Sequence, residues 1–136
     1  MKLQINTLLA LYSVLEFAAE PDRHIPAAEI AAKYEVSAHH LAKVLAELTH
    51  AGVVESVRGA GGGYRFAANA RRLTLMDVIA LFEDIAPPPA RRDAAATPVD
   101  QALGAVLAEI DQIARSTFSS ITIATMLRLV QRQRKR

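Results

Sequence analysis

The sequence predicts a mainly α-helical protein with one small β-hairpin, and three stretches support this prediction. Residues 29–51 have the spacing of two short helices joined by a tight turn. Residues 53–67 read as two short strands on either side of a glycine-rich tip, GAGGG. Residues 98–117 place apolar side chains three or four positions apart, as one face of a long helix requires. In this order the stretches are the plan of a winged helix-turn-helix domain followed by a long C-terminal dimerisation helix.

Length and composition fit a folded domain with a hydrophobic core. The chain has 136 residues, of which 51% are hydrophobic. It contains no cysteine, which excludes disulfides, zinc held by thiolates and iron-sulfur clusters held by cysteine. The apolar run of residues 8–19 resembles the core of a signal peptide, but Glu16 interrupts it, and no apolar stretch approaches the ~20 residues that cross a bilayer. We therefore expect a cytoplasmic protein that does not contact a membrane.

The first two helices are delimited by prolines. The first should run from Gln4 to Ala19, because Pro21 follows it. Its apolar residues recur at the spacing of one buried face, and they are Ile5, Leu8, Leu9, Tyr12 and Leu15. Pro26 suits the first turn of the second helix, where a missing N–H has no consequence, and this helix should end near Tyr34.

The second and third helices have the spacing of a helix-turn-helix unit. In such units an aliphatic residue and an alanine of the first helix meet aliphatic residues of the turn and of the second helix. The residues at these places are Ile30, Ala31, Val36, Leu41 and Val44. Glu35 departs from the pattern, because the turn often has glycine there to allow a positive φ. We expect a strain of about 1 kcal/mol at Glu35, or a different turn.

The expected recognition helix spans residues 38–51. Ser37 is a good N-cap and Gly52 suits the position after the C-cap. At roughly 100° per residue, the inward face is formed by Leu41, Val44, Leu45 and Leu48. The opposite face carries His39, Lys43, Ala46 and His50, with His40 and Glu47 on its flank.

The wing should consist of strands at Val53–Arg58 and Tyr64–Ala67, joined by a loop with glycine at positions 59, 61, 62 and 63. A glycine-rich loop can also bind the phosphates of a nucleotide, but neither GxGxxG nor GKS/T opens a helix here. A flexible hairpin tip is therefore the favoured interpretation.

A short helix and a linker follow the wing. Thr74 and Asp77 form a capping signal for a helix that should reach Asp84. The sequence APPPARRDAAAT is rich in proline and alanine and predicts an exposed linker. The expected division is thus 1–85 for the winged helix-turn-helix domain, 86–97 for the linker and 98–136 for the dimerisation helix and the C-terminal helix.

The long helix should begin at Pro98 after Thr97. Its apolar residues step by 4, 3, 4, 3 and 4 positions and form one narrow stripe, which we call the α-stripe: Val99, Leu103, Val106, Ile110, Ile113 and Thr117. The stripe could pack against the chain's own first helix or against a second copy of the chain. Self-association is preferred, because little else in the chain can cover a helix of this length. A last amphipathic helix carries Ile123, Met126, Leu127 and Val130.

The charge distribution favours a nucleic-acid partner more than the net charge of +2 does. Residues 1–35 hold three basic and five acidic side chains, a balance of −2. Residues 37–72, which include the expected recognition helix and wing, hold five basic and two acidic side chains, a balance of +3. The basic C-terminal end is expected to be simply solvated.

These motifs resemble a family of bacterial winged-helix repressors that includes the iron-sulfur cluster regulator IscR and the nitric-oxide sensor NsrR. The matching pieces are Ser37, HLxKVL at residues 40–45, SVRGxGGGY at residues 56–64 and LTLxDV at residues 73–78. The HLxKV form is closest to the nitric-oxide-sensing branch. The resemblance covers residues 1–85 well and the last two helices in outline. It implies a dimer that binds double-stranded DNA, probes the major groove with the recognition helix and reaches the backbone or the minor groove with the wing.

The DNA-binding candidates lie at the start of the recognition helix and on the wing. They are Ser37, Ala38, His39, His40, Lys43, Arg58, Gly59, Gly61, Gly62 and Arg65. The dimerisation candidates are Val99, Leu103, Val106, Ile110 and Ile113.

The chain departs from its cluster-binding relatives at the metal ligands. Those relatives have three cysteines in the loop before the long helix, and some have a carboxylate at the place of Leu8. The loop here has no cysteine, so the resemblance implies a member of the family without a cluster, a metal or another cofactor. His39 and His40 could bind a metal as a pair, but this is not expected, because adjacent helical side chains point about 100° apart and the sequence shows no second cluster with ligand spacing.

Other functions remain as alternatives. A winged helix can also serve protein contacts without binding DNA, and salt-dependent retention on duplex DNA would separate the two uses. An enzyme is not expected, because the sequence shows no paired carboxylates, no nucleophile with a base and no metal-ligand spacing. A small-molecule effector between the long helices and the DNA-binding half is compatible with the sequence, but no residue identifies it.

Overall fold

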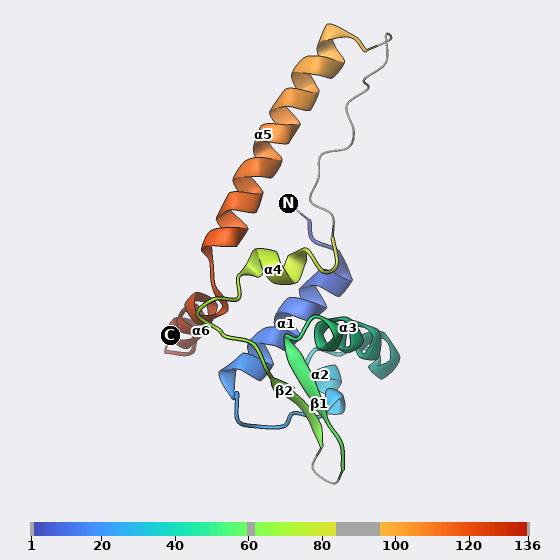
Figure 1. Cartoon of the computed structure of the whole chain (residues 1–136), viewed down its shortest axis with the longest axis vertical. Coiled ribbons are helices and arrows are strands. Elements are labelled where there is room, and N and C mark those ends of the chain that lie inside the picture. Colours follow the sequence, from blue (N-terminus) through green and yellow to red (C-terminus); the bar gives the residue numbers. More distant parts are fainter. Residues whose placement is uncertain (1, 60–61, 84–95, 136) are drawn as a thin grey trace.

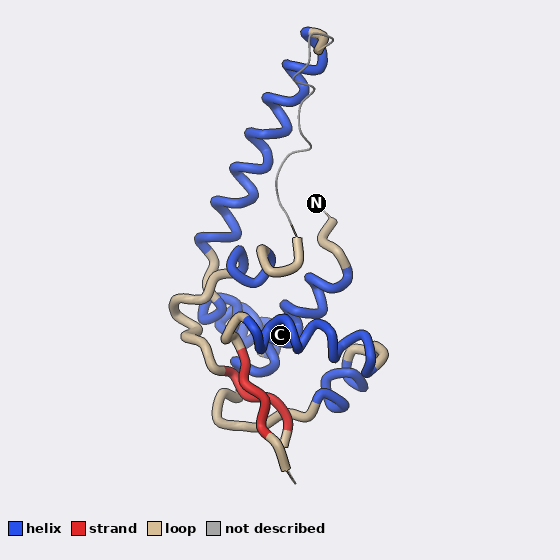
Figure 2. The backbone as a smooth tube through the Cα atoms, turned by 45° about the vertical axis from the view of Figure 1, so that its right-hand side comes forward, coloured by secondary structure: helices blue, strands red, loops and turns tan. Residues whose placement is uncertain are grey.

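The computed structural model describes residues 2–59, 62–83 and 96–135. Two antiparallel strands form a hairpin, and helices surround its base (Figure 1). The elements are α1 (Ile5–Ala19), α2 (Ala27–Lys33), α3 (Ala38–His50), β1 (Val54–Val57), β2 (Gly63–Phe66), α4 (Leu75–Ile79), α5 (Pro98–Ser120) and α6 (Ile123–Arg134). The hairpin and α5 project from opposite ends of the molecule, and Figure 2 shows the same from a second side. None of the described helices is long and apolar enough to cross a membrane.

The core lies where α1, α3, the base of the hairpin and α6 meet. Phe17 of α1, Leu41 and Leu45 of α3, Val54 of β1 and Ile123 of α6 are almost completely buried in one cluster. The last helix therefore shares the core of the N-terminal part, which the sequence-based division at residue 98 did not anticipate.

The prediction for the buried face of α1 was correct for Leu9 and wrong for the other four residues. Ile5 and Tyr12 are exposed, and Leu8 and Leu15 are only half-buried. The buried face consists instead of Thr7, Leu9, Ala10, Ser13, Val14, Phe17 and Ala18. Because apolar residues occur on nearly all sides of this helix, their spacing does not select one face. The small side chains allow α3 and α6 to approach closely, and this packing selects the face.

The helix-turn-helix prediction is confirmed. Ile30 and Ala31 are buried against the inward face of α3, and Glu35 has φ 54°, the only positive φ of a non-glycine residue in the described part of the chain. The Ser37 side chain accepts a hydrogen bond from the His40 amide at 3.0 Å, as expected of an N-cap. Pro26 occupies the N-cap of α2 rather than its first turn.

The end of α3 is a Schellman motif. Gly52 has φ 76°, its N–H donates to Thr49 O at 3.0 Å, and the Val53 N–H donates to Leu48 O at 3.0 Å. The chain thereby leaves α3 and enters β1, so the wing begins directly at the C-terminal end of the recognition helix.

The two strands form the predicted hairpin, although β1 is shorter than the expected Val53–Arg58 and β2 begins and ends one residue before the expected Tyr64–Ala67. Val54 pairs with Phe66 and Val57 pairs with Gly63. A third extended segment joins them, because Ile25 and Tyr64 exchange two backbone hydrogen bonds of 2.8 and 2.9 Å. This bridge fixes the base of the wing to the loop before α2.

The helix after the wing begins as predicted and ends earlier. Thr74 and Asp77 form a complete capping box. The helix was expected to reach Asp84, but it ends at Ile79. Beyond this residue, backbone amides donate to the carbonyl three residues earlier, as in a 3₁₀ turn. The Leu81 N–H donates to Val78 O at 3.1 Å, and Phe82 bonds in the same way. Asp84 lies outside the described residues.

The long helix begins where the sequence predicts and is tied to the body at its far end. Thr97 and Asp100 form its capping box, and the Thr97 amide and hydroxyl hold the pKa of the Asp100 carboxyl below its ordinary value. At the other end, the Leu75 N–H donates to Ile121 O at 2.9 Å. The Ile123 N–H donates to Leu73 O at 2.8 Å, so the junction of α5 and α6 is fixed to the start of α4.

Candidate nucleic-acid interface

The outward face of α3 is exposed as predicted. Its four members His39, Lys43, Ala46 and His50 are all exposed, whereas the opposite face is buried in the core. Ser37 and Ala38 at the start of the helix are exposed as well. With 13 residues, α3 is about 20 Å long. A helix of this size fits the major groove of B-DNA, which is about 12 Å wide.

The two wing arginines differ in their surroundings. Arg58 is exposed and forms no ion pair with any described residue. Arg65 pairs with Glu55, because the register of the hairpin places these residues opposite each other. The positive charge of Arg65 is therefore partly neutralised, while that of Arg58 is fully available.

Sequence reasoning missed a contact between α1 and the recognition helix. The His40 ring nitrogen Nε2 is hydrogen-bonded to Asn6 Oδ1, a residue 34 positions away. The N–H of Gln4, the N-cap residue of α1, donates to Glu83 Oε2 at 3.1 Å. His40 is thus held at the edge of the reading face by the first turn of α1, and only part of its ring is available to a base.

The backbone conformation at the tip of the wing requires glycine. Gly59 has φ 108°, and the Gly62 N–H donates to Gly59 O at 2.9 Å. A Cβ atom at Gly62 would lie 2.5 Å from Val57 O, so any side chain there would collide with the backbone. The fourth predicted tip residue, Gly61, lies outside the described residues.

A cleft of about 420 Å³ separates α3 from the wing. It is lined by Ala46, Thr49, His50, Ser56 and Tyr64. The Tyr64 ring packs against Phe17 of α1 with 6.1 Å between the ring centroids. The reading face and the wing thus form one continuous concave surface.

The α-stripe is exposed along its whole length. Its aliphatic members, Val99, Leu103, Val106, Ile110 and Ile113, keep between 52% and 73% of their surface exposed. No described residue of α5 is buried. The alternative in which this stripe packs against the chain's own first helix is therefore wrong.

The donor atoms of the chain do not fit an iron-sulfur site. The sequence has no cysteine, and the described residues contain no group of three His, Cys, Asp or Glu side chains that could hold a metal ion. Leu8 offers no ligand atom on α1. A cluster held by thiolates has no ligands here.

Comparison with protein families relates almost the whole chain to one family. The model of the Rrf2 family, described as an iron-dependent transcriptional regulator, matches residues 3–129. A protein of Rhodopseudomonas palustris named as an HTH-type transcriptional regulator, BadM, is 47% identical over 136 residues, which are all of this chain and 87% of that protein. IscR of Vibrio campbellii is 34% identical over 85 residues, which are 62% of this chain and 51% of IscR.

Solved structures share the fold. CymR, the global cysteine regulator of B. subtilis, superposes with a TM-score of 0.78 at 23% identity, over 95% of this chain and 98% of CymR. IscR of T. potens superposes with a TM-score of 0.71 at 24% identity, over 96% of this chain and 88% of that one. At this level of identity the likeness concerns the fold alone.

Proposed function

The chain belongs to the Rrf2 family of transcriptional regulators, and we propose that it is a homodimeric repressor that binds a pseudo-palindromic DNA operator. The observation that carries the proposal is the separation of two exposed surfaces. The reading face of α3 and the wing lie at one end of the molecule, and the apolar α-stripe lies on the helix that projects from the other end (Figure 1). Family membership favours DNA binding over a winged helix that only contacts proteins.

The start of α3 supplies the contacts to base edges. In helix-turn-helix proteins the N-terminal residues of the recognition helix lie nearest the bases. Here they are Ser37, Ala38, His39, His40 and Lys43. The Ser37 oxygen accepts the His40 amide, but its O–H remains free to donate to a phosphate.

The wing supplies backbone or minor-groove contacts. Arg58 is the principal contact, because its charge is available, and Arg65 contributes less, because Glu55 competes for it. The tip glycines let the backbone approach the DNA closely. DNA affinity should then fall steeply with salt concentration.

A two-fold dimer through the α-stripe presents two reading faces to one side of the DNA. Its half-sites should lie about one helical turn, roughly 34 Å, apart. Sequencing the genomic fragments that the purified protein selects will identify the operator. Fragments without a common motif, or a motif without two-fold symmetry, would contradict the proposal.

We predict that replacing Arg58 by alanine weakens operator binding by about 1 to 3 kcal/mol and lowers the slope of log affinity against log salt by about 1. Arg58 is exposed, so the melting temperature should change little. Fluorescence anisotropy with labelled operator measures both quantities. Arg132→Ala removes the same charge from an exposed position on α6 and should leave binding unchanged. Equal effects of the two substitutions would remove Arg58 from the interface.

We also predict that the purified protein is colourless and contains no iron. No cysteine is present to hold a cluster, and the described residues offer no alternative set of ligands. Absorption in the visible region and iron analysis by mass spectrometry test this, and operator affinity should not change on exposure to air. Stoichiometric iron would contradict the prediction.

A further inference from the structure

Two contiguous cavities lie between α1, α2 and α6, on a part of the molecule that the DNA-binding surfaces do not use. Their volumes are about 440 and 370 Å³. They share the lining residues Glu16, Ala19, Lys33, Leu127, Val130 and Arg134. The groove thereby connects the first helix of the helix-turn-helix unit with the C-terminal helix.

The inner part of the groove has apolar walls. Leu15 and Tyr12 of α1 face Leu127 and Val130 of α6 across it. Tyr12 and Tyr34 stack with 4.9 Å between their ring centroids and only 6° between their planes. These side chains offer a flat apolar surface that suits a ring or a hydrocarbon chain.

The polar side chains of the inner groove differ in whether they have hydrogen-bond partners within the protein. The Glu16 carboxylate accepts bonds from Lys33 Nζ at 2.5 Å and from the Tyr34 hydroxyl at 2.6 Å. Burial raises the pKa of Glu16, but these two hydrogen bonds, together with the charges of Lys33 and Arg134, more than offset burial and hold that pKa below its ordinary value. Burial and the Glu16 carboxylate also raise the pKa of Tyr34. At neutral pH the Glu16 carboxylate is therefore charged, and it already accepts hydrogen bonds from Lys33 and Tyr34.

Arg134 is the cation of the groove that has no bonded partner among the described residues. It acts on Glu16 only through space, while Lys33 already neutralises that carboxylate. The inner groove thus combines an apolar surface with one uncompensated positive charge. An acidic ligand group would obtain a charge-assisted hydrogen bond from the planar guanidinium.

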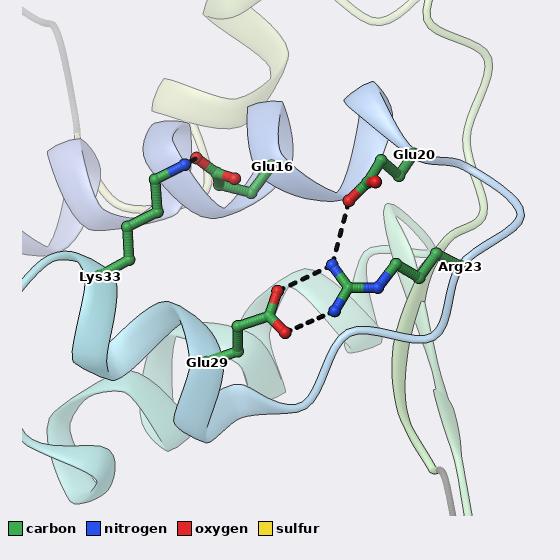
Figure 3. A network of polar contacts seen from close by, with 5 residues as sticks. All are labelled: Glu16, Glu20, Arg23, Glu29 and Lys33. Carbon is green, nitrogen blue, oxygen red and sulfur yellow. Dashed lines mark hydrogen bonds and ion pairs between the residues drawn. The ribbon is translucent and has the colours of Figure 1, made fainter.

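The outer end of the groove is electrostatically less favourable for such a ligand. Figure 3 shows Arg23 between Glu20 and Glu29, with the two terminal nitrogens of its guanidinium turned towards these carboxylates. Arg23 bonds Glu29 at 2.8 and 2.5 Å and Glu20 at 3.1 Å, and these carboxylates raise its pKa. One arginine faces two carboxylates there, so the ionised side chains that line only the outer cavity carry one net negative charge, and an anion is favoured in the inner cavity.

We propose that the groove between α1, α2 and α6 is a binding site for a small organic monoanion with a flat apolar body. The acidic group pairs with Arg134, and the apolar body lies against the Tyr12 and Tyr34 pair and Val130. The interpretation of this site as the site of a regulatory effector rests on the proposed function of the protein as a transcriptional regulator. The binding itself does not depend on DNA.

The test uses the DNA-free full-length protein and two fluorescent probes. Anilinonaphthalene sulfonate is a flat apolar monoanion, and N-phenyl-1-naphthylamine has the same aromatic body without the charge. Arg134→Gln should weaken binding of the sulfonate about fivefold to tenfold and leave binding of the neutral probe unchanged. Arg132→Gln, a matched change two residues away, should affect neither probe, and circular dichroism should show that both variants remain folded.

A second variant separates the groove from the α-stripe, which can also bind apolar probes. Val130→Trp fills the groove and should reduce binding of both probes without changing the sedimentation behaviour of the protein. Equal sulfonate affinity of the wild type, Arg134→Gln and Val130→Trp would overturn the proposal. Because no DNA is present, that result would leave the proposed repressor function untouched, and failure to select an operator would leave the site untouched.

Discussion

Replacing Ile110 by glutamate should convert the proposed dimer to monomers and abolish operator binding at protein concentrations that saturate the wild type. Ile110 lies at the centre of the α-stripe and is exposed in the single chain. In a two-fold dimer, the substitution introduces two carboxylates into an apolar interface without cationic partners. We expect the dimer dissociation constant to rise at least 100-fold, which corresponds to about 3 kcal/mol. Sedimentation velocity over a range of protein concentrations measures this directly.

A charge at a different place on the same helix is the appropriate control. Ala108 is exposed and lies two positions from Ile110, about 200° around the helix. Ala108→Glu should therefore keep the dimer and the operator affinity of the wild type. An intact dimer in the Ile110→Glu variant would exclude the α-stripe as the self-association surface. Equal dissociation of both variants would show that charge on α5, rather than its position, is responsible.

The helix-turn-helix and the wing could be predicted because their signals are local. Ile30, Ala31 and Leu41 are separated by the fixed spacing of one structural unit. Ser37 and Gly52 act on amides and carbonyls within five residues. Interactions of this kind are determined by the nearby sequence alone, so they do not depend on how the rest of the chain packs.

The sequence-based predictions failed where contacts between elements distant in the sequence determine which residues are buried. The first helix is apolar on several sides, and only its contacts with α3 and α6 decide that Ala10 is buried and Ile5 is exposed. The fold also returns α6 to the core through Ile123, a contact of a kind that periodicity does not encode.

In the candidate site, too, the features with local sequence signals could be predicted and those that depend on distant contacts could not. The exposed face of α3 follows from helical geometry, and the pair of Glu55 with Arg65 could have been found by counting back from the hairpin tip. The bond of His40 to Asn6 has no local signal, because it joins two helices whose relative position depends on the core. The groove at Arg134 needs three helices and has no sequence pattern at all.

A methyl group added at Gly63 should detach the base of the wing. Its Cβ atom would lie 2.6 Å from the carbonyl carbon and oxygen of Ile25 and 2.8 Å from the nitrogen of Pro26. These are backbone atoms, so the collision is relieved only if the Ile25 segment moves away. That movement breaks the two hydrogen bonds between Ile25 and Tyr64 and pulls a buried isoleucine from the core. We expect Gly63→Ala to lower the free energy of unfolding by about 3 kcal/mol.

Three measurements distinguish this mechanism from a general loss of stability. The melting temperature should fall by several degrees. The Tyr64 amide, which donates to Ile25 O at 2.9 Å in the wild type, should exchange with solvent faster than the amides of α3. Operator affinity should fall even well below the melting temperature, because Arg58 is displaced with the wing. Ser56→Ala, an exposed change on the neighbouring strand, should leave the melting temperature and the exchange of the Tyr64 amide unchanged. Full protection of the Tyr64 amide in Gly63→Ala would show that the bridge accommodates a side chain, and the wing would then owe its position to its contacts with α3 and Phe17 instead.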